Sequence, residues 1–262
     1  MTRKIHKSAQ LEVTLQIKDD EFISPPRMAQ KNAILNRALK EFVSDLKALD
    51  KTANKFVAGD TETHLQDRTQ AVMSDVEIME DWQIPLMQAM ANSITASKGD
   101  ILEIGYGRGI SAAMIQQQGV KSHTIIECND DVVVRYSQWK NTLPDCDIRL
   151  VHGLWQSTID SLGLFDGIFF HTYPLDEDEY MTYVHGSTTF AEHFFAVASA
   201  HLNEGGTFTY MTNEIDSLSR EHQRLIFQHF SSFTLQIVPL AMPSDVKDTW
   251  WADSMAVVKA IK

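Results

Sequence analysis

The chain has 262 residues, of which 44% are hydrophobic and 22% are charged. These values are typical of one large globular domain or slightly more, and they exclude disorder, collagen or coiled coil as descriptions of the whole chain. The net charge of −12 repels phosphate backbones and anionic lipids, so neither nucleic acid nor a membrane is expected as partner. With two cysteines and no long apolar run, we expect a cytoplasmic protein without a membrane span or secretory leader. The ten histidines form no metal-binding motif, so no metal is expected.

Residues 1–95 are predicted to form a mostly helical extension. Alternating apolar residues over 11–17 indicate a short strand. Two prolines open a pattern of apolar residues at three- and four-residue steps over 26–58, which predicts an amphipathic helix. A second helical pattern covers 71–96, where Pro85 predicts a kink or break. The extension is expected either to cover a substrate pocket as a lid or to form a homodimer contact, and the dimer is favoured.

Residues 96–262 alternate between short apolar runs and stretches of helical length. The runs are ILEIG (101–105), HTIIEC (123–128), DIRLV (147–151), FDGIFF (165–170), GGTFTYM (205–211), FTLQIVPL (233–240) and MAVVKAI (255–261). Continuous apolar strands separated by helices indicate a parallel sheet that is covered on both faces. The predicted fold is therefore α/β, a doubly wound, mostly parallel, Rossmann-like sheet.

A glycine-rich loop follows the first of these runs. Three glycines recur at 105, 107 and 109, and a helix is expected to begin at Ile110. Such a loop lets the backbone approach a ligand closely, and the helix N-terminus offers free N–H groups. The acid Glu103 before the loop, and the lack of a glycine at 110, fit the methyltransferase version of this fold better than the dehydrogenase version. Glu127, at the end of the next run, is placed to accept both ribose hydroxyls of an adenosine cofactor.

Six segments together resemble guanidinoacetate N-methyltransferase and its arginine-methylating relatives. They are IMEDWQIPLM (78–87), LEIGYGRGI (102–110), IIECND (125–130), GLW (153–155), FDGIFFHTYPL (165–175) and LNEGGTFTYM (202–211). The resemblance covers about residues 60–262 and implies a class I methyltransferase that uses S-adenosylmethionine. With the glycine loop, it gives the candidate cofactor-binding residues Phe56, Met79, Met87, Glu103, Gly105, Tyr106, Gly107, Gly109, Ile110, Glu127, Asn129, Trp155 and Gln156.

The sequence departs from that family where the family holds its guanidinium group. Two family carboxylates are replaced here by Gln83 and His171, and Glu214 stands where the family has a hydroxyl residue. Without both acids the bidentate, charge-assisted clamp for a guanidinium is lost, so guanidinoacetate is not expected as the acceptor. The candidate substrate-binding residues are Gln83, His171, Tyr173 and Glu214.

The function predicted from the sequence is methyl transfer from S-adenosylmethionine to a nitrogen of a small metabolite, in a specialised pathway. His171 is the candidate catalytic base, with a predicted titration near pH 6–7. Two alternatives remain open at this point. One is an O-methyltransferase that acts on a hydroxyl or carboxylate with His171 as base. The other is a non-catalytic subunit that binds the cofactor or a partner.

Overall fold

A computed structural model of the chain describes residues 2–6, 12–16, 68–244, 250 and 252–262. The chain divides into two units, Met1–Thr61 and Glu62–Lys262. Each unit is described here by itself. Within the residues that the structure describes, no helix is both long enough and apolar enough to cross a bilayer.

The described part of the first unit is one pair of strands. Strand β1 (Thr2–His6) pairs antiparallel with β2 (Glu12–Gln16). The strand predicted over 11–17 is confirmed as β2. The helix predicted over 26–58 and the candidate cofactor residue Phe56 lie outside the described residues.

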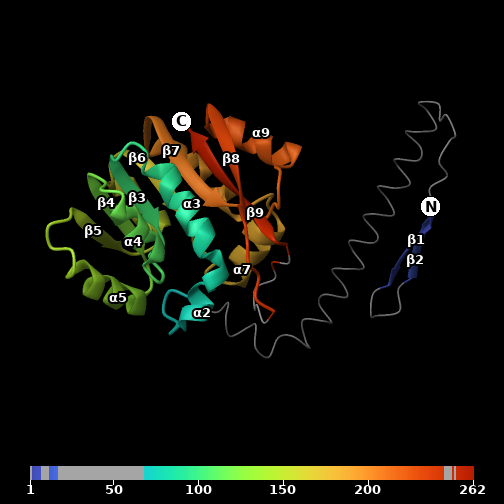
Figure 1. The fold of residues 1–262 in the computed structure, drawn as a ribbon, viewed down its shortest axis with the longest axis horizontal. Coiled ribbons are helices and arrows are strands. Elements are labelled where there is room, and N and C mark those ends of the chain that lie inside the picture. The colour runs from blue at the N-terminus through green and yellow to red at the C-terminus, as the bar shows by residue number, and fades with distance from the viewer. Residues whose placement is uncertain (1, 7–11, 17–67, 245–249, 251) are drawn as a thin grey trace. The chain divides into compact units, whose positions relative to one another are not determined.

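The second unit is built on a seven-stranded sheet in the order β5-β4-β3-β6-β7-β9-β8 (Figure 1). Its strands are β3 (Asp100–Ile104), β4 (Ser122–Glu127), β5 (Ile148–His152), β6 (Phe165–Phe170), β7 (Leu202–Met211), β8 (Ser232–Pro239) and β9 (Ser254–Ile261). The first five strands of this order are parallel, whereas β9 runs antiparallel to both β7 and β8. The predicted doubly wound, mostly parallel α/β sheet is confirmed, and all seven predicted runs form strands.

Short helices precede β3 and connect the strands that follow it. They are α2 (Asp75–Ile78), η1 (Asp81–Gln83), α3 (Ile84–Ile94), α4 (Ile110–Gln117), α5 (Asp130–Lys140), α6 (Trp155–Thr158), η2 (Ile159–Ser161), α7 (Glu177–Glu179), η3 (Tyr180–His185), η4 (Phe190–Phe194), α8 (Phe195–Ala200) and α9 (Arg220–His229). The helical pattern over 71–96 is divided among α2, η1 and α3. The predicted break is confirmed, because α3 begins at Ile84 and holds Pro85 in its first turn, where a missing N–H costs nothing.

Apolar side chains cover both faces of the sheet, as the uninterrupted apolar runs predict. In β6, Ile168 and Phe170 belong to a buried cluster that also contains residues of η4, α8 and α9. Between them in sequence, Phe169 belongs to a second cluster, which contains Leu86, Met87 and Met90 of α3. Because successive strand residues point to opposite faces, this alternation places α3 on one face and α8 and α9 on the other.

The strand order also defines where a ligand can enter. From β3 the chain adds β4 and β5 on one side, and then returns to add β6 and β7 on the other. The connections after β3 and β6 therefore diverge at the carboxyl ends of these adjacent strands. Such a switch point leaves a crevice, and in open α/β sheets ligands bind there.

Candidate functional site

The glycine loop lies at this switch point, between β3 and α4. Gly105, Gly107 and Gly109 all have positive φ angles, of 89°, 52° and 74°. A Cβ atom on Gly105 would stand 2.5 Å from the carbonyl oxygen of His171, which follows β6. A Cβ on Gly109 would overlap the ring of Tyr106. The loop path therefore requires glycine for both backbone angle and space.

Glu127, at the end of β4, holds the glycine loop through its carboxylate. Oε2 accepts from the backbone N–H groups of Tyr106 (2.9 Å) and Gly107 (3.3 Å). Oε1 accepts from those of Cys128 (2.8 Å) and Asn129 (2.9 Å). The carboxylate is buried beside the loop. It is also a structural tie between β4 and the loop, which the sequence did not indicate. Its contact with the ribose hydroxyls stays a prediction.

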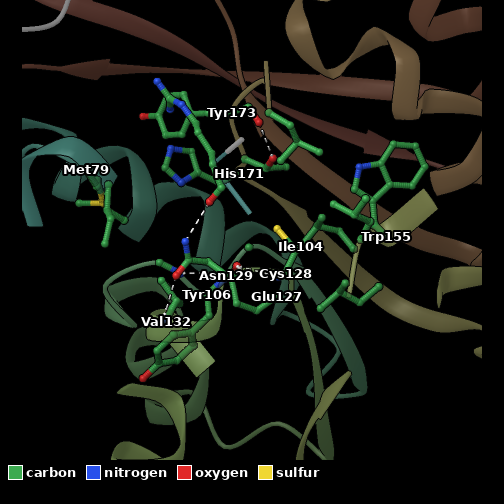
Figure 2. Close-up of a pocket in the computed structure, with 18 of the residues that line it drawn as sticks. Met79, Ile104, Tyr106, Glu127, Cys128, Asn129, Val132, Trp155, His171 and Tyr173 are labelled. Atoms are coloured by element: carbon green, nitrogen blue, oxygen red, sulfur yellow. Dashed lines mark hydrogen bonds between the residues drawn. The ribbon is translucent and has the colours of Figure 1, made fainter. Parts of the chain in front are cut away.

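One pocket opens around these two features (Figure 2). It encloses about 1040 Å³ of space, part of which is open to solvent. The predicted site residues that line it are Met79, Met87, Gly105, Tyr106, Gly107, Ile110, Glu127, Asn129, Trp155, Gln156, His171 and Tyr173. Of the other candidates that the structure describes, Gln83, Glu103, Gly109 and Glu214 do not line it.

Two sulfur-containing and several aromatic side chains give the pocket soft, polarizable walls. Met79 and Met87 are buried yet line the pocket, and Figure 2 shows Met79 and Trp155 on opposite sides of it. The Trp155 ring packs edge-on against Phe194, with centroids 4.9 Å apart. Such walls suit a flat heterocycle and a sulfonium group. With the glycine loop and the Glu127 carboxylate, the pocket fits S-adenosylmethionine.

Asn129 lines the pocket, but its side chain has structural partners. Its Oδ1 accepts from the N–H groups of Asp131 and Val132 and so caps α5. Its Nδ2 donates to the carbonyl oxygens of Arg68 and Ala71, both at 2.9 Å. Its amide thus anchors the segment 68–71 beside the pocket. The expected direct contact with the cofactor stays a prediction.

Glu103 is fully buried under the loop rather than exposed in the pocket. Its carboxylate accepts a hydrogen bond from Ser111 Oγ, and Oε2 lies 3.0 Å from Nε2 of the equally buried His123. The other ring nitrogen of His123 contacts Gln116 Nε2 at 3.1 Å. These partners make Glu103 a support that ties β3 to β4 and α4. Its assignment as a cofactor contact is not supported by this geometry.

The acceptor side of the pocket is formed by the connection after β6. The Tyr173 hydroxyl accepts a hydrogen bond from Nε2 of buried Gln83 at 3.1 Å. Gln83 thus positions Tyr173 and does not itself line the pocket. The rings of His171 and Tyr173 lie edge to face, with centroids 5.5 Å apart, and Figure 2 shows them side by side. His171 Nε2 is buried and has no hydrogen-bond partner among the described residues.

Burial lowers the pKa of His171 to about 4, because the charged imidazolium is poorly solvated there. This differs from the predicted titration near pH 6–7. The imidazole is therefore neutral at pH 7, and a group with so low a pKa is a weak proton acceptor. Its unpartnered nitrogen is better suited to one hydrogen bond with an acceptor molecule.

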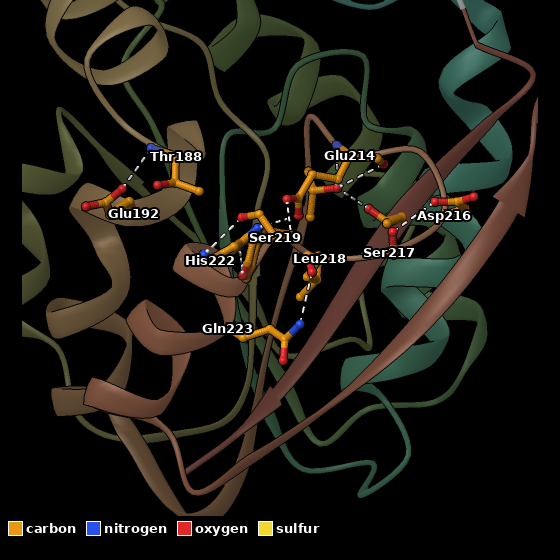
Figure 3. A network of polar contacts seen from close by, with 12 residues as sticks. Thr188, Glu192, Glu214, Asp216, Ser217, Leu218, Ser219, His222 and Gln223 are labelled. Carbon is orange, nitrogen blue, oxygen red and sulfur yellow. Dashed lines mark hydrogen bonds and ion pairs between the residues drawn. The ribbon is translucent and has the colours of Figure 1, made fainter. Parts of the chain in front are cut away.

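Glu214 belongs to a separate polar network, shown in Figure 3, and it does not line the pocket. Its Oε1 accepts from the N–H of Ser219 (2.6 Å), and its Oε2 lies 2.7 Å from Nδ1 of buried His222. His222 Nε2 in turn contacts the Tyr210 hydroxyl at 2.8 Å. The carboxylate thus holds the first turn of α9 onto β7, and this geometry does not support a substrate contact. The family resemblance placed Glu214 after the strand but could not show which way its side chain turns.

Two arginines near the pocket were missed by sequence reasoning. Arg68 lines the pocket, and its guanidinium carbon lies 5.8 Å from the ring centroid of Tyr173. Arg108, within the glycine loop, donates to the carbonyl oxygen of Met79 (3.0 Å) and to Asp81 Oδ1 (2.6 Å). No short motif marks Arg68, and Arg108 lies inside the glycine loop at a position whose side chain the glycine pattern does not specify. Arg108 links the loop to the segment that leads into η1.

Comparisons with known proteins give partial matches at low identity. The protein arginine N-methyltransferase 2 of Eremothecium gossypii is 30% identical over 105 residues, which are 37% of this chain and 25% of that protein. That of Saccharomyces cerevisiae is 26% identical over 132 residues, 46% of this chain and 32% of that protein. The chain thus matches only about a quarter to a third of the length of these relatives. The solved structure of the N-methyltransferase NodS from Bradyrhizobium japonicum superposes with a TM-score of 0.48 and 14% identity, over 70% of this chain and 98% of that one.

The family comparison covers more of the chain. The sequence model of the family described as guanidinoacetate N-methyltransferase matches residues 47–232. This range contains the glycine loop, Glu127, Trp155 and the connection that carries His171 and Tyr173. The chain belongs to the guanidinoacetate N-methyltransferase family.

Proposed function

We propose that this chain transfers a methyl group from S-adenosylmethionine to a nitrogen of a small metabolite. The observation that carries the proposal is one pocket at the sheet's switch point, where the glycine loop, the Glu127 carboxylate and Trp155 meet. Family membership supports the same cofactor. When bound, S-adenosylmethionine supplies a methyl group already activated by its sulfonium charge.

The residues of this chain would then act mainly by positioning. Glu127 would hold the ribose hydroxyls, while Met79, Met87 and Trp155 would enclose the rest of the cofactor and exclude water. His171 and Tyr173 would orient the acceptor nitrogen through hydrogen bonds. A neutral acceptor nitrogen would give its lone pair to the new N–C bond while the electron pair of the broken C–S bond stays on sulfur, and the resulting ammonium would lose its proton to solvent after product release.

The acceptor side favours a neutral or anionic molecule over a guanidinium. Besides Glu127, two carboxylates line the pocket, but Glu77 Oε2 accepts from Ser74 and Glu179 Oε2 accepts from the Leu175 N–H. Neither occupies the positions of Gln83 and His171, where a guanidinium clamp is expected. The curated relatives are named protein arginine methyltransferases, so an arginine side chain is the competing acceptor for this same pocket.

Two measurements test the proposal. Calorimetric titration with S-adenosylmethionine should show saturable binding, and its absence would contradict the cofactor assignment. A methyl-transfer screen should then compare small amines with phenols, carboxylic acids, guanidinoacetate and arginine-containing peptides. Methylation of amines supports the proposal. Brisk methylation of guanidinoacetate or of peptide arginine would refute the acceptor assignment, and transfer only to phenols or acids would favour O-methylation. Cofactor binding without any transfer would favour the non-catalytic reading.

We further propose that the amphipathic segment 26–58 forms a homodimer contact or covers the pocket, with the dimer favoured. The basis is its apolar stripe, which must be buried somewhere. A chain that begins at Gly59 tests this by sedimentation and activity. If that chain stays soluble, keeps the oligomeric state of the full protein and is fully active, both roles are excluded.

A further inference from the structure

Arg68 is held at the wall of the pocket by its backbone. Its N–H donates to the carbonyl oxygen of Leu175 at 3.3 Å, and its own carbonyl oxygen accepts from Asn129 Nδ2 at 2.9 Å. The first bond reaches the connection after β6, and the second reaches the residue that caps α5. The segment is thus fixed to the two sides of the site, and the Arg68 guanidinium carbon lies 5.8 Å from the centroid of the Tyr173 ring.

This guanidinium brings a permanent positive charge to the pocket. Burial lowers the pKa of Arg68, whereas the neighbouring Tyr173 and Glu77 raise it. An arginine nevertheless stays protonated at any physiological pH. Glu77 offsets part of the charge, but its Oε2 also accepts from both the backbone N–H and the hydroxyl of Ser74, at 2.7 Å each. A guanidinium at the wall of a cavity can bind a ligand that carries the opposite charge.

A second polar group, the imidazole of His171, lines the same pocket next to Tyr173. The Tyr173 ring lies beside both the Arg68 guanidinium and the His171 ring, with 5.8 Å from the guanidinium carbon and 5.5 Å from the imidazole centroid to its own centroid. His171 presents a buried, unpartnered Nε2 within the described part of the chain. The wall therefore offers a permanent cation and a neutral hydrogen-bonding nitrogen, both next to the same aromatic ring.

We propose that the acceptor carries a carboxylate that Arg68 binds, with its methyl-accepting nitrogen toward His171. The acceptor class is thus an amino acid or an aminobenzoate-like metabolite. The planar guanidinium can bind both carboxylate oxygens in parallel, which fixes the direction of the molecule as well as its charge. This inference rests on the proposed function and adds the anionic group of the substrate.

The test uses matched acids and primary amides as acceptors with radiolabelled S-adenosylmethionine. Suitable pairs are glycine and glycinamide, histidine and histidinamide, tryptophan and tryptophanamide, and anthranilate and anthranilamide. In the wild type we expect the acid of the productive pair to exceed its amide by about 10–100-fold in kcat/KM, the range for a charge-assisted hydrogen bond. Arg68→Gln should remove most of this preference by raising KM for the acid alone. Arg68→Lys should keep part of it, because the charge remains.

Controls separate this inference from the proposed function. Lys121→Gln removes an exposed cation that does not line the pocket, and it should leave the acid preference unchanged. An equal preference for amides, an unaltered preference in Arg68→Gln, or no methylation of any pair despite cofactor binding would overturn the inference. Weaker binding of S-adenosylmethionine by Arg68→Gln with an unchanged acid preference would assign Arg68 to the cofactor's own carboxylate and also overturn it. Failure of the wild type to bind S-adenosylmethionine would instead refute the proposed function.

Discussion

Replacing Glu127 with glutamine tests the cofactor site, because the two side chains have almost the same shape. The glutamate carboxylate accepts four backbone N–H bonds, from Tyr106, Gly107, Cys128 and Asn129. A carboxamide offers one oxygen and one NH₂ group. Whichever way it turns, two of the four backbone donors would face another donor.

The expected effect on folding follows from that count. A buried donor without a partner costs about 1–3 kcal/mol. The bond from Gly107 is long, at 3.3 Å, and the loop can tilt toward the remaining oxygen, so the lower end of the range applies. We expect the free energy of unfolding without cofactor to fall by about 2 kcal/mol. Loss of one charge-assisted bond to the ribose should also weaken S-adenosylmethionine binding by about 10–100-fold.

Urea denaturation followed by circular dichroism measures the first effect, and calorimetric titration measures the second. Glu204→Gln is the matched control, because Glu204 is exposed and does not line the pocket. The control should change neither quantity. If folded Glu127→Gln protein binds S-adenosylmethionine as tightly as the wild type, Glu127 does not hold the ribose and the site assignment is wrong.

Three further predictions concern the loop, the acceptor side and the separate polar network. Gly105→Ala should lower the melting temperature more than Gly119→Ala, since both have positive φ but only the first would strike a backbone oxygen; equal losses would contradict the close approach to His171. Burial lowers the pKa of His171 from 6.5 in the unfolded chain to about 4. The free energy of unfolding should therefore be highest above pH 6.5 and should fall by up to about 3 kcal/mol as the pH drops to 4, because the unfolded chain binds the proton first. In His171→Asn, the free energy of unfolding measured with urea should change less between pH 6.5 and pH 4. An unchanged pH dependence would refute the lowered pKa of His171. Glu214→Gln should reduce the free energy of unfolding by about 1–3 kcal/mol, because it weakens the bond to His222. It should leave binding of S-adenosylmethionine unchanged. A loss of affinity would show that Glu214 belongs to the binding site after all.

The fold could be predicted from sequence because its signals are local. Uninterrupted apolar runs mark strands buried on both faces, and the glycines at 105, 107 and 109 mark a turn that other residues cannot form. Glu127 and His171 each stand at the carboxyl end of a parallel strand, so they are expected at the same edge of the sheet. This expectation needs no knowledge of the packing. The pocket-lining residues Met79, Met87 and Trp155 came from the family resemblance, which carries information that periodicity does not.

The roles that sequence could not supply depend on side-chain direction and on partners far along the chain. Glu103 precedes the loop by two residues, but its partner His123 is on the neighbouring strand and only the folded sheet brings them together. Asn129 follows the predicted acid, yet it serves the start of α5 and the segment at Arg68. Arg68 itself lies in no recognisable motif, since a cation acquires its role from the cavity it faces.

The two hydrogen bonds of Arg108, to the Met79 carbonyl oxygen and to Asp81, matter for engineering the choice of methyl acceptor. Arg108 stands between two glycines of the donor loop, while Asp81 begins the short helix that ends at Gln83. A library of variants that alters the acceptor side by changing the helix Asp81–Gln83 would therefore also shift the loop that holds the methyl donor. Tyr173 and His171 belong to a different connection, after β6. Directed evolution toward new acceptors should begin there and leave the Arg108 anchor intact.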